Sequence, residues 1–313
     1  MAAEDSKTWD VVVVGGGASG LSAALVLGRA RRRTLLVDAG EQSNLAAAAV
    51  GGMLGFDGRP PAELYAEGRR ELEKYPAVEL REGEVVSGAR LAGGGFELEL
   101  DGGQRERARR VLLATGMEYR PPGLPGIAER WGGSVFHCPF CHGWEVRERP
   151  LGVLDRGAEG ARRALLLTAW SDDLTLFSDG PAELGEEDAE RLAAAGVAVD
   201  ERQVAGLRGP GAKLEAVVFA DGGERRCEGL QVPVTLHRRS ELAAELGAAA
   251  ADPNPLSAEA VAVDSMGATG VPGLSAAGDL SLGMPSVANA VAAGSKAAAV
   301  MVHGLTEERR QRA

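Results

Sequence analysis

The chain has 313 residues, of which 45% are apolar, 4% are aromatic and 44 are glycine. This length suits about two domains of ordinary size, and the glycine-rich composition favours tightly turned α/β units. The formal net charge of −11 at pH 7 argues against nucleic acid and anionic membranes as partners, because both would be repelled at long range. No apolar stretch approaches the roughly 20 residues that span a bilayer, so we expect no membrane segment.

The N-terminus and the cysteine content predict a cytoplasmic protein. Residues 1–10 are polar and acidic and lack the basic and apolar stretches of a secretion signal. Only three cysteines are present, too few for a disulfide scaffold. Cys227, which stands alone in the sequence, is expected to be an inert packed thiol.

The first elements follow a strand–loop–helix–strand pattern. The β-branched run Val11–Val14 predicts a buried parallel strand that stops at a glycine-rich loop, residues 15–20. A helix over 21–29 and a second strand over 34–37 follow, and the strand ends at Asp38. This order and spacing are those of a βαβ unit that binds a dinucleotide.

Each glycine of the G-x-G-x-x-G loop has a physical role in such a unit. Gly15 permits the tight turn, Gly17 lets backbone amides approach a pyrophosphate, and Gly20 lets helix and strand pack closely. The helix N-terminus favours the phosphate, and Asp38 is placed to accept hydrogen bonds from an adenosine ribose. The alternative, a glycine turn that binds nothing, remains open.

A helix and several strands are expected to complete the first part of the chain. Residues 60–75 have the pattern of an amphipathic helix, and the segments 77–87, 95–100 and 109–113 alternate as strands do. The last of these strands runs into Ala114-Thr115-Gly116, and the prolines that follow indicate a domain boundary.

A second βαβ unit follows, and the chain then returns to the composition of the first. Strands are expected over 151–154 and 174–177, separated by a helix over 158–170, and a helix over 186–195 precedes a strand meander to about residue 236. Near the end, Ala277-Gly278-Asp279 places a carboxylate beside the start of a helix over 286–303. Such a site suits a ribityl hydroxyl group and a pyrophosphate.

These elements predict an α/β fold with two Rossmann-like, three-layer dinucleotide-binding domains, the second inserted into the first. The FAD-binding domain is expected over residues 1–119 and 247–313. The inserted NAD(P)-like domain is expected over residues 120–246 and carries the redox cysteines.

Two cysteines three residues apart, Cys138 and Cys141, are flanked by His137 and His142. A Cys-x-x-Cys turn can cycle between dithiol and disulfide, and nearby positive charge lowers the pKa of the first thiol. Thiol exchange also moves protons, which an imidazole with its ordinary pKa near 6.5 can accept and return near neutral pH. Zinc is the other interpretation, but one Cys-x-x-Cys without a second pair does not supply a tetrahedral set, and we expect no metal.

Together these motifs resemble the low-molecular-weight thioredoxin reductases, over about residues 10–305. The string His137–Glu145, His-Cys-Pro-Phe-Cys-His-Gly-Trp-Glu, is similar to that of a flavoprotein subset that includes the dithiol oxidases of gliotoxin- and holomycin-type metabolites. The resemblance implies a homodimer with FAD in the first domain, Cys141 facing the flavin and Cys138 exchanging with substrate. The catalytic residues expected are Cys138, Cys141, His142 and His137. The expected cofactor-binding residues are Gly15, Gly17, Ala18, Ser19, Gly20, Asp38, Ala114, Thr115, Gly116, Gly278 and Asp279.

The second glycine loop departs from the family pattern and argues against NAD(P)H as a cofactor. It reads Asp155-Arg156-Gly157-Ala158-Glu159-Gly160, so a carboxylate stands where the first glycine is expected. A pyrophosphate would meet this charge at a cost of about 1 kcal/mol in water and several when partly desolvated. Where NADP-binding proteins place arginines, the chain has Ser178-Asp179-Gly180. Binding of NAD or NADPH through altered contacts, including Arg156, remains the alternative.

The leading hypothesis is therefore a FAD-dependent thiol–disulfide oxidoreductase that is not driven by NADPH. Oxygen would reoxidise the flavin in a dithiol oxidase, or a ferredoxin or another flavin would reduce it in a reductase. The substrate is expected to be a small dithiol or disulfide, or a thioredoxin-like protein. One alternative is an NAD(P)H-dependent thioredoxin-disulfide reductase. Another is a non-catalytic redox sensor that uses its flavin and disulfide as a switch.

Overall fold

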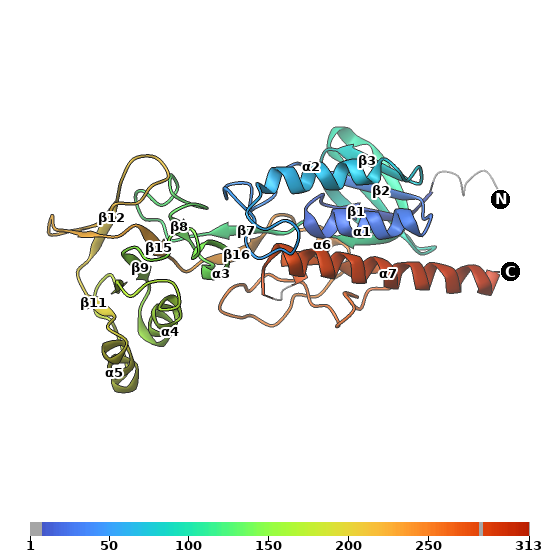
Figure 1. Ribbon diagram of the computed structural model, residues 1–313. Helices are drawn as coiled ribbons and strands as arrows, with labels where there is room; N and C mark the ends of the chain where they lie inside the picture. The colour runs from blue at the N-terminus through green and yellow to red at the C-terminus, as the bar shows by residue number, and fades with distance from the viewer. Residues whose placement is uncertain (1–7, 282–283, 313) are drawn as a thin grey trace. The chain divides into compact units, whose positions relative to one another are not determined.

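The computed structural model describes residues 8–281 and 284–312, which form two compact units (Figure 1). The first unit comprises the described residues up to 45, residues 53–119, and those from 236 onward; the second comprises 46–52 and 120–235. The longer stretch of the second unit spans residues 120–235, and the domain boundaries expected from the sequence, 119/120 and 246/247, stay predictions. The cofactor assigned to each domain stays a prediction.

The first unit is built on a seven-stranded mixed sheet. The order is β3-β2-β1-β6-β5-β4, and β17 also pairs with β6. Its strands are β1 (Thr8–Val14), β2 (Thr34–Asp38), β3 (Val78–Glu82), β4 (Val85–Arg90), β5 (Phe96–Leu100), β6 (Arg105–Leu113) and β17 (Leu274–Ala276). Its other elements are α1 (Ala18–Arg29), α2 (Pro61–Leu72), η2 (Asp101–Gly103), β7 (Met117–Arg120), β16 (Thr235–Arg238), α6 (Leu242–Glu245), η3 (Gly278–Ser281) and α7 (Val287–Arg312), and β7 and β16 pair with each other.

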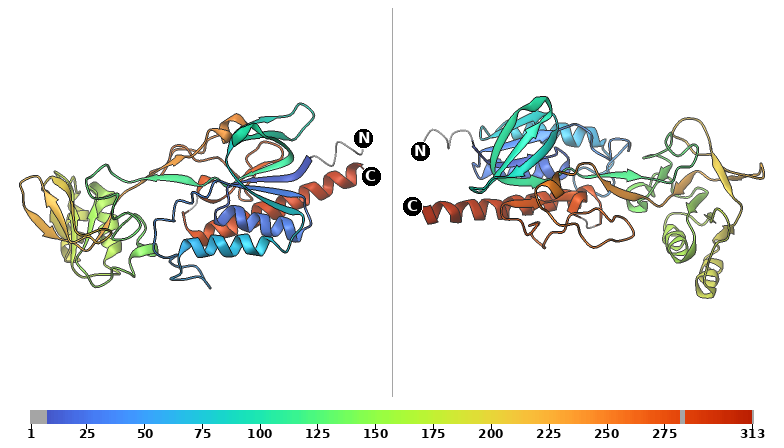
Figure 2. Two further views of the ribbon diagram at one scale, coloured as in Figure 1. Left: turned by 90° about the horizontal axis from the view of Figure 1, so that it is seen from above. Right: turned by 180° about the vertical axis from the view of Figure 1, so that it is seen from behind.

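Strand β6 holds the C-terminal segment to the N-terminal one. Its residues 107–113 pair in parallel with β1, residues 105–108 pair antiparallel with β5, and residues 111–113 pair in parallel with β17. The parallel register brings the ends of β1, β6 and β17 to one edge of the sheet, where ligands bind in open α/β sheets. Helices α1, α2 and α7 cover one face together (Figure 2), and Leu27, Tyr65 and Met301 are among the buried residues of that core.

The expected strand over 77–87 divides into β3 and β4. Gly83 has φ +143°, outside the range that side chains other than glycine readily adopt, and the backbone turns there. The Asp101 carboxylate accepts a hydrogen bond from the amide of Glu84 at 3.0 Å and fixes the turn. The final helix extends to Arg312, beyond the expected end near residue 303.

The second unit is a three-layer structure. Its central sheet is parallel throughout, in the order β11-β10-β9-β15-β8, and a three-stranded antiparallel sheet, β12-β13-β14, forms a second layer. Helices α4 and α5 supply the third layer and a separate apolar core. The elements are β8 (Val135–Phe136), α3 (Pro139–His142), β9 (Leu151–Leu154), α4 (Gly157–Leu167), β10 (Leu174–Phe177), α5 (Glu186–Ala194), β11 (Ala198–Asp200), β12 (Val204–Arg208), β13 (Ala216–Phe219), β14 (Glu224–Arg226) and β15 (Gly229–Gln231).

The α/β class with parallel Rossmann-like sheets is confirmed. The two strand–helix–strand units over β1-α1-β2 and β9-α4-β10 lie where the sequence predicts them. Among the described residues, no helix combines the length and apolar composition needed to cross a lipid bilayer.

Helices α1 and α7 pack so closely that their contact requires a residue without a side chain at position 294. A Cβ atom on Gly294 of α7 would lie 1.9 Å from the carbonyl oxygen of Ser19, which is backbone and cannot rotate away. We therefore predict that Gly294→Ala lowers the free energy of unfolding by about 1–3 kcal/mol, the usual cost of overpacking. Chemical denaturation followed by circular dichroism measures it.

Gly304→Ala on the same helix is the matched control. Its Cβ would meet the Arg110 guanidinium, the far end of a flexible side chain. The gain in helix propensity, about 1 kcal/mol, should then offset any loss. Equal destabilisation of the two variants would contradict the account.

Candidate functional site

The first glycine loop joins β1 to α1 at the carboxyl edge of the first unit's sheet. Gly15 has φ +105°, and a Cβ there would lie 2.3 Å from the carbonyl oxygen of Ala114. A Cβ on Gly20 would lie 1.8 Å from the carbonyl oxygen of Gly15. Among the described residues, only Gln42 lies within 4 Å of a Cβ built on Gly17, so the loop is open on that side. The three glycines therefore have the turn, open-approach and close-packing geometry expected of each.

The start of α1 has the properties of an anion site. Its N-cap is Gly17, no side chain caps it, and its first turn has no acidic residue. The Ser19 hydroxyl is buried without a hydrogen-bond partner among the described residues. A Cβ on Gly278 would lie 3.1 Å from that of Ser19, so the η3 segment reaches the same place. Free helical N–H groups and an orphaned hydroxyl fit a pyrophosphate.

Asp38 is held against the glycine loop by four donors. Its Oδ1 accepts hydrogen bonds from the amides of Gly16 and Gly40 and from Gln42 Nε2, at 2.9–3.2 Å. Its Oδ2 pairs with Arg69 Nη1 at 3.0 Å. A carboxylate has about four acceptor positions, so Oδ2 retains one for a ribose hydroxyl. The sequence pattern did not indicate Arg69.

The other carboxylate of the expected flavin site, Asp279, lies in η3. Tyr119 donates its hydroxyl to Asp279 Oδ2 at 2.7 Å, and burial raises the pKa of this carboxyl group. Ala114-Thr115-Gly116 lies directly after β6, against Gly15. The structure thus brings together all the expected cofactor-binding residues within one unit, and these residues fit a dinucleotide such as FAD.

In the second unit, the redox pair lies on a single helical turn between β8 and β9. Cys138 is the N-cap of α3 with extended backbone, Pro139 begins the turn, and the Cys141 amide donates to the Cys138 carbonyl at 3.2 Å. Both thiols are free and partly buried. The carbonyl oxygen of Cys141 lies 2.7 Å from the position of a Cβ on Gly51, so glycine allows segment 46–52 to pass the turn closely.

The two thiols differ in acidity, so that one holds its proton near neutral pH and the other loses it. A hydrogen bond from the Cys141 thiol, with further ones from the backbone of residues 140 and 141, lowers the pKa of Cys138 to about 7 despite burial. The same hydrogen bond, burial and the charge on Cys138 raise the pKa of Cys141 well above its usual range. Near neutral pH, Cys138 is therefore the thiolate of the pair, as an attacking or leaving sulfur requires.

Both neighbouring histidines are neutral near pH 7, which differs from the ordinary pKa expected from sequence. Burial, with the charges of His142 and Arg163, lowers the pKa of His137 to about 4. Burial also lowers the pKa of His142. The two rings stack on Trp131 and Phe136, at 5.8 and 5.6 Å between centroids. Cys141, and not an imidazolium, is thus the main stabiliser of the Cys138 thiolate.

His142 remains suited to accept a proton. Neither of its ring nitrogens has a hydrogen-bond partner among the described residues, and both atoms are buried. A neutral imidazole can accept a proton, and the burial that lowers the pKa of His142 makes it a weaker base than a free histidine. Within the described residues, no group of three or more His, Cys, Asp or Glu side chains is arranged to hold a metal ion.

The second glycine loop already contains an internal anion. Asp155 Oδ1 accepts the Arg156 amide at 2.9 Å, and Oδ2 pairs with Arg163 Nη1 at 3.3 Å. Both Asp155 and Arg163 are largely buried, 18% and 16% exposed. The Asp155 carboxylate thus lies directly before Arg156, the N-cap of α4, and places a negative charge near the amides that a nucleotide phosphate would approach, while no side chain caps the helix itself.

Two arginines of the second unit, Arg156 and Arg202, already have hydrogen-bond or ion-pair partners. Arg156 donates to the Asp179 carbonyl at 3.0 Å and lies 3.7 Å from the Glu183 carboxylate. Arg202 forms a two-pronged pair with Asp200, at 2.6 and 2.9 Å. Neither guanidinium is available to a 2′-phosphate without losing these partners.

Comparison with known proteins places the chain among the disulphide oxidoreductases. Residues 9–294 match the family described as pyridine nucleotide-disulphide oxidoreductase. Thioredoxin reductase tcpT of Claviceps purpurea is 35% identical over 231 residues, 70% of this chain and 71% of the relative. Thioredoxin reductase aclD of Aspergillus oryzae is 33% identical over 57% of this chain, and the match spans 59% of that relative, less than two thirds of its length.

Two solved structures are similar over nearly the whole chain. The crystal structure of HlmI has 38% identity and a TM-score of 0.90, covering 97% of this chain and 95% of that one. An oxidoreductase from Agrobacterium tumefaciens has 38% identity and a TM-score of 0.89, covering 96% and 99%.

The hydrogen bond between the two sulfurs makes a prediction about reactivity. Cys141→Ala removes the donor, so the pKa of Cys138 should rise from about 7 toward the ordinary thiol value near 8.5. Because only the thiolate reacts, alkylation of Cys138 by iodoacetamide at pH 7 should slow roughly tenfold. Rates across pH 5–10 in the reduced, anaerobic protein, followed by mass spectrometry, give the midpoint.

Cys227→Ser is the control for this measurement. Burial raises the pKa of Cys227 to about 12, so its loss should leave the Cys138 profile unchanged. A midpoint that stays near 7 in Cys141→Ala would show that another group stabilises the thiolate.

Proposed function

The chain belongs to the pyridine nucleotide-disulphide oxidoreductase family, as a thioredoxin reductase-like flavin disulfide oxidoreductase, and we propose that it exchanges electrons between a dithiol or disulfide substrate and FAD without NADPH. The observation that carries this proposal is the Asp155–Arg163 ion pair at the start of α4. An internal carboxylate there opposes a nicotinamide pyrophosphate by its charge. Dithiol oxidation with oxygen, or reduction with another donor such as a ferredoxin, is the direction this favours.

The first unit supplies the residues that would hold FAD. The amides at the start of α1 and the Ser19 hydroxyl would bind the pyrophosphate, Asp38 the adenosine ribose, and Asp279 the ribityl chain. When bound, FAD supplies a two-electron acceptor or donor for the sulfur pair. Tyr119 keeps Asp279 oriented within the site.

In dithiol oxidation, the Cys138–Cys141 disulfide is the protein's oxidant. A substrate thiolate attacks Cys138, the Cys138–Cys141 bond breaks, and Cys141 leaves with the electron pair. The second substrate thiol then attacks its own sulfur in the mixed disulfide, which releases Cys138 and closes the substrate disulfide. Two protons leave the substrate: the high pKa of Cys141 keeps one on that sulfur, and His142 accepts the other. Disulfide reduction is the same sequence reversed.

The names of the relatives favour a second candidate function, an NAD(P)H-dependent thioredoxin-disulfide reductase. It requires the nucleotide to displace Asp155 from the start of α4. A homodimer in the cytoplasm, with a small dithiol or a thioredoxin-like protein as partner, belongs to our proposal in either direction.

Anaerobic titration of the FAD-loaded protein separates the two functions. We expect dithiothreitol to abolish the flavin absorbance near 450 nm within seconds (on the order of a turnover time), and NADPH and NADH to leave it unchanged. Cys138→Ser should keep the FAD and lose the response to dithiothreitol. Rapid loss of flavin absorbance with NADPH would support the reductase, and no response to any dithiol would favour a non-catalytic sensor.

The role of Asp155 predicts a gain of nucleotide binding. Asp155→Gly removes the carboxylate, frees Arg163 and restores the first glycine, so the affinity for NADPH should rise at least about fivefold, the effect of one unscreened charge contact. Fluorescence titration of bound NADPH measures it. Asp172→Gly makes the same change before the start of β10, at the sheet edge opposite to Asp155, which follows β9, and should have no effect. Equal affinities in the two variants would exclude Asp155 as the obstacle.

A further inference from the structure

Gln231, the last residue of β15, has a polar side chain in a buried position. It is 4% exposed. In the central sheet of the second unit, β15 lies between β9 and β8, and Gln231 is paired with Val153 on one side and with Phe136 on the other. Both of these neighbours are fully buried apolar residues. Burying an amide group among them has a cost unless it is hydrogen-bonded, so its partners decide what it contributes.

One end of the Gln231 side chain binds the redox turn directly. Its Nε2 donates a hydrogen bond to the carbonyl oxygen of His137 at 2.9 Å. The pairing of β8 with β15 ends at Phe136, whose carbonyl oxygen accepts a hydrogen bond from the amide of Val232 at 2.9 Å. The side chain therefore extends the hydrogen bonding of the sheet by one residue beyond the end of β8, to the residue directly before Cys138.

The other end of the same side chain is not hydrogen-bonded. Gln231 Oε1 is buried and has no donor among the described residues. Exchanging the two ends of the amide would set Oε1 against the His137 carbonyl, one acceptor against another, so the N–H group is the end that faces the turn. An unpaired buried carbonyl lowers stability and offsets what the hydrogen bond gains. The amide thus contributes more to the position of the turn than to the stability of the fold.

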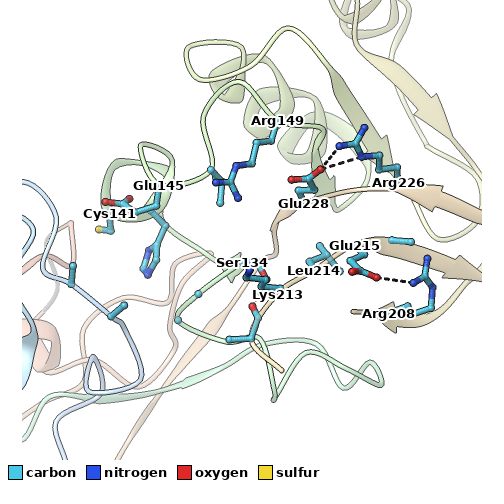
Figure 3. A pocket seen from close by; sticks show the side chains of 18 of the residues that line it. Ser134, Cys141, Glu145, Arg149, Arg208, Lys213, Leu214, Glu215, Arg226 and Glu228 are labelled. Atoms are coloured by element: carbon cyan, nitrogen blue, oxygen red, sulfur yellow. Dashed lines mark hydrogen bonds and ion pairs between the residues drawn. The ribbon is translucent and has the colours of Figure 1, made fainter. Parts of the chain in front are cut away.

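On another side, the redox turn faces open space. A cavity of about 880 Å³ lies beside it within the second unit, and Cys141 and His142 form part of the cavity wall (Figure 3). Side chains that face a cavity lack packing contacts on that side. Gln231 does not line this cavity and holds the turn from the sheet. An anchor at the sheet therefore matters more for this turn than it would for a turn packed on all sides.

The position of the turn decides the acidity of Cys138. The donors that stabilise its thiolate are the Cys141 thiol and the backbone of residues 140 and 141, all of them on the turn itself. Hydrogen bonds weaken steeply as their distance and angle depart from the optimum. The His137 carbonyl belongs to the peptide group that joins His137 to Cys138. Fixing that carbonyl therefore fixes the backbone of Cys138 relative to the donors.

We propose that Gln231 is a positioning residue of the redox pair, because its hydrogen bond to the His137 carbonyl keeps Cys138 aligned with the donors of residues 140 and 141. This inference rests on the proposed function, since the pair that it positions is the redox site of that function. Gln231 acts through the backbone and takes no part in the proton or electron steps.

Gln231→Met tests this role, because it removes both the donor and the unpaired acceptor at nearly constant length and shape. The midpoint for alkylation of Cys138 by iodoacetamide, about 7 in the unchanged protein, should rise by about half a pH unit, which slows alkylation at pH 7 about twofold. The melting temperature should change by less than about 4 °C, since the two losses offset each other. The pH series used for Cys141→Ala, on the FAD-loaded protein, and thermal unfolding followed by circular dichroism measure both.

Thr175→Val is the matched control. It makes a polar-to-apolar change of constant size at a buried position of the same sheet, on β10, two strands away from β15. The midpoint for Cys138 should stay at about 7 in this variant. The charged groups that act on the turn, Glu145 and Arg163, are intact in both variants. A shift confined to Gln231→Met therefore comes from the position of the turn.

Combining Gln231→Met with Cys141→Ala shows whether the two residues act together. Because Cys141 supplies the main donor, Gln231→Met should move the Cys138 midpoint less in this background than it does alone. An equal shift in both backgrounds, or an unchanged midpoint in Gln231→Met, would overturn the positioning role. A shift that comes with a larger fall in melting temperature than expected would also overturn it, since the role would then be structural.

The outcomes separate this inference from the proposed function. The alkylation rate reports the reactivity of Cys138 without any turnover of a dithiol. An unchanged midpoint in Gln231→Met would overturn the positioning role even where dithiothreitol reduces the flavin. A protein whose flavin responds to no dithiol would overturn the proposed function, whatever the midpoint of Cys138.

Discussion

The first unit depends on the pairing of β6 with strands from three parts of the chain. β1 precedes it by about a hundred residues, β5 forms a hairpin with it, and β17 returns from the far side of the second unit. Because parallel strands share an edge at their carboxyl ends, this pairing sets the glycine loop, the Ala114–Gly116 turn and Asp279 side by side. Without β17 on β6, the start of α1 would lack the segment that carries Gly278 and Asp279.

The same βαβ geometry has opposite electrostatic outcomes in the two units. At the start of α1 no side chain caps the helix, the first turn has no acidic residue, and the buried Ser19 hydroxyl has no hydrogen-bond partner among the described residues. The start of α4 is also uncapped, but Asp155 directly precedes its N-cap and Glu159 lies in its first turn. These negative charges oppose a nucleotide phosphate, and Asp155 has an internal partner in Arg163.

In the redox turn, one cysteine sets the acidity of the other. The Cys138 thiolate is stabilised chiefly by a hydrogen bond from Cys141 and not by a cation. Burial keeps His137 and His142 neutral, which removes a positive charge from the turn and leaves His142 as a base.

The sequence alone determined the α/β class, the two βαβ units and the residues of the glycine loops and the sulfur pair. These features can be predicted because each depends on residues that are close together in the sequence. The examples are glycine where the backbone turns, β-branched runs in buried strands, and cysteines three residues apart. Only the tertiary structure decided which side chains pair with the carboxylates of the expected cofactor site. Arg69 reaches Asp38 across 31 residues and Tyr119 reaches Asp279 across 160, and no local pattern encodes such contacts. The depressed pKa values of the histidines likewise arise from burial, which exists only in the folded chain.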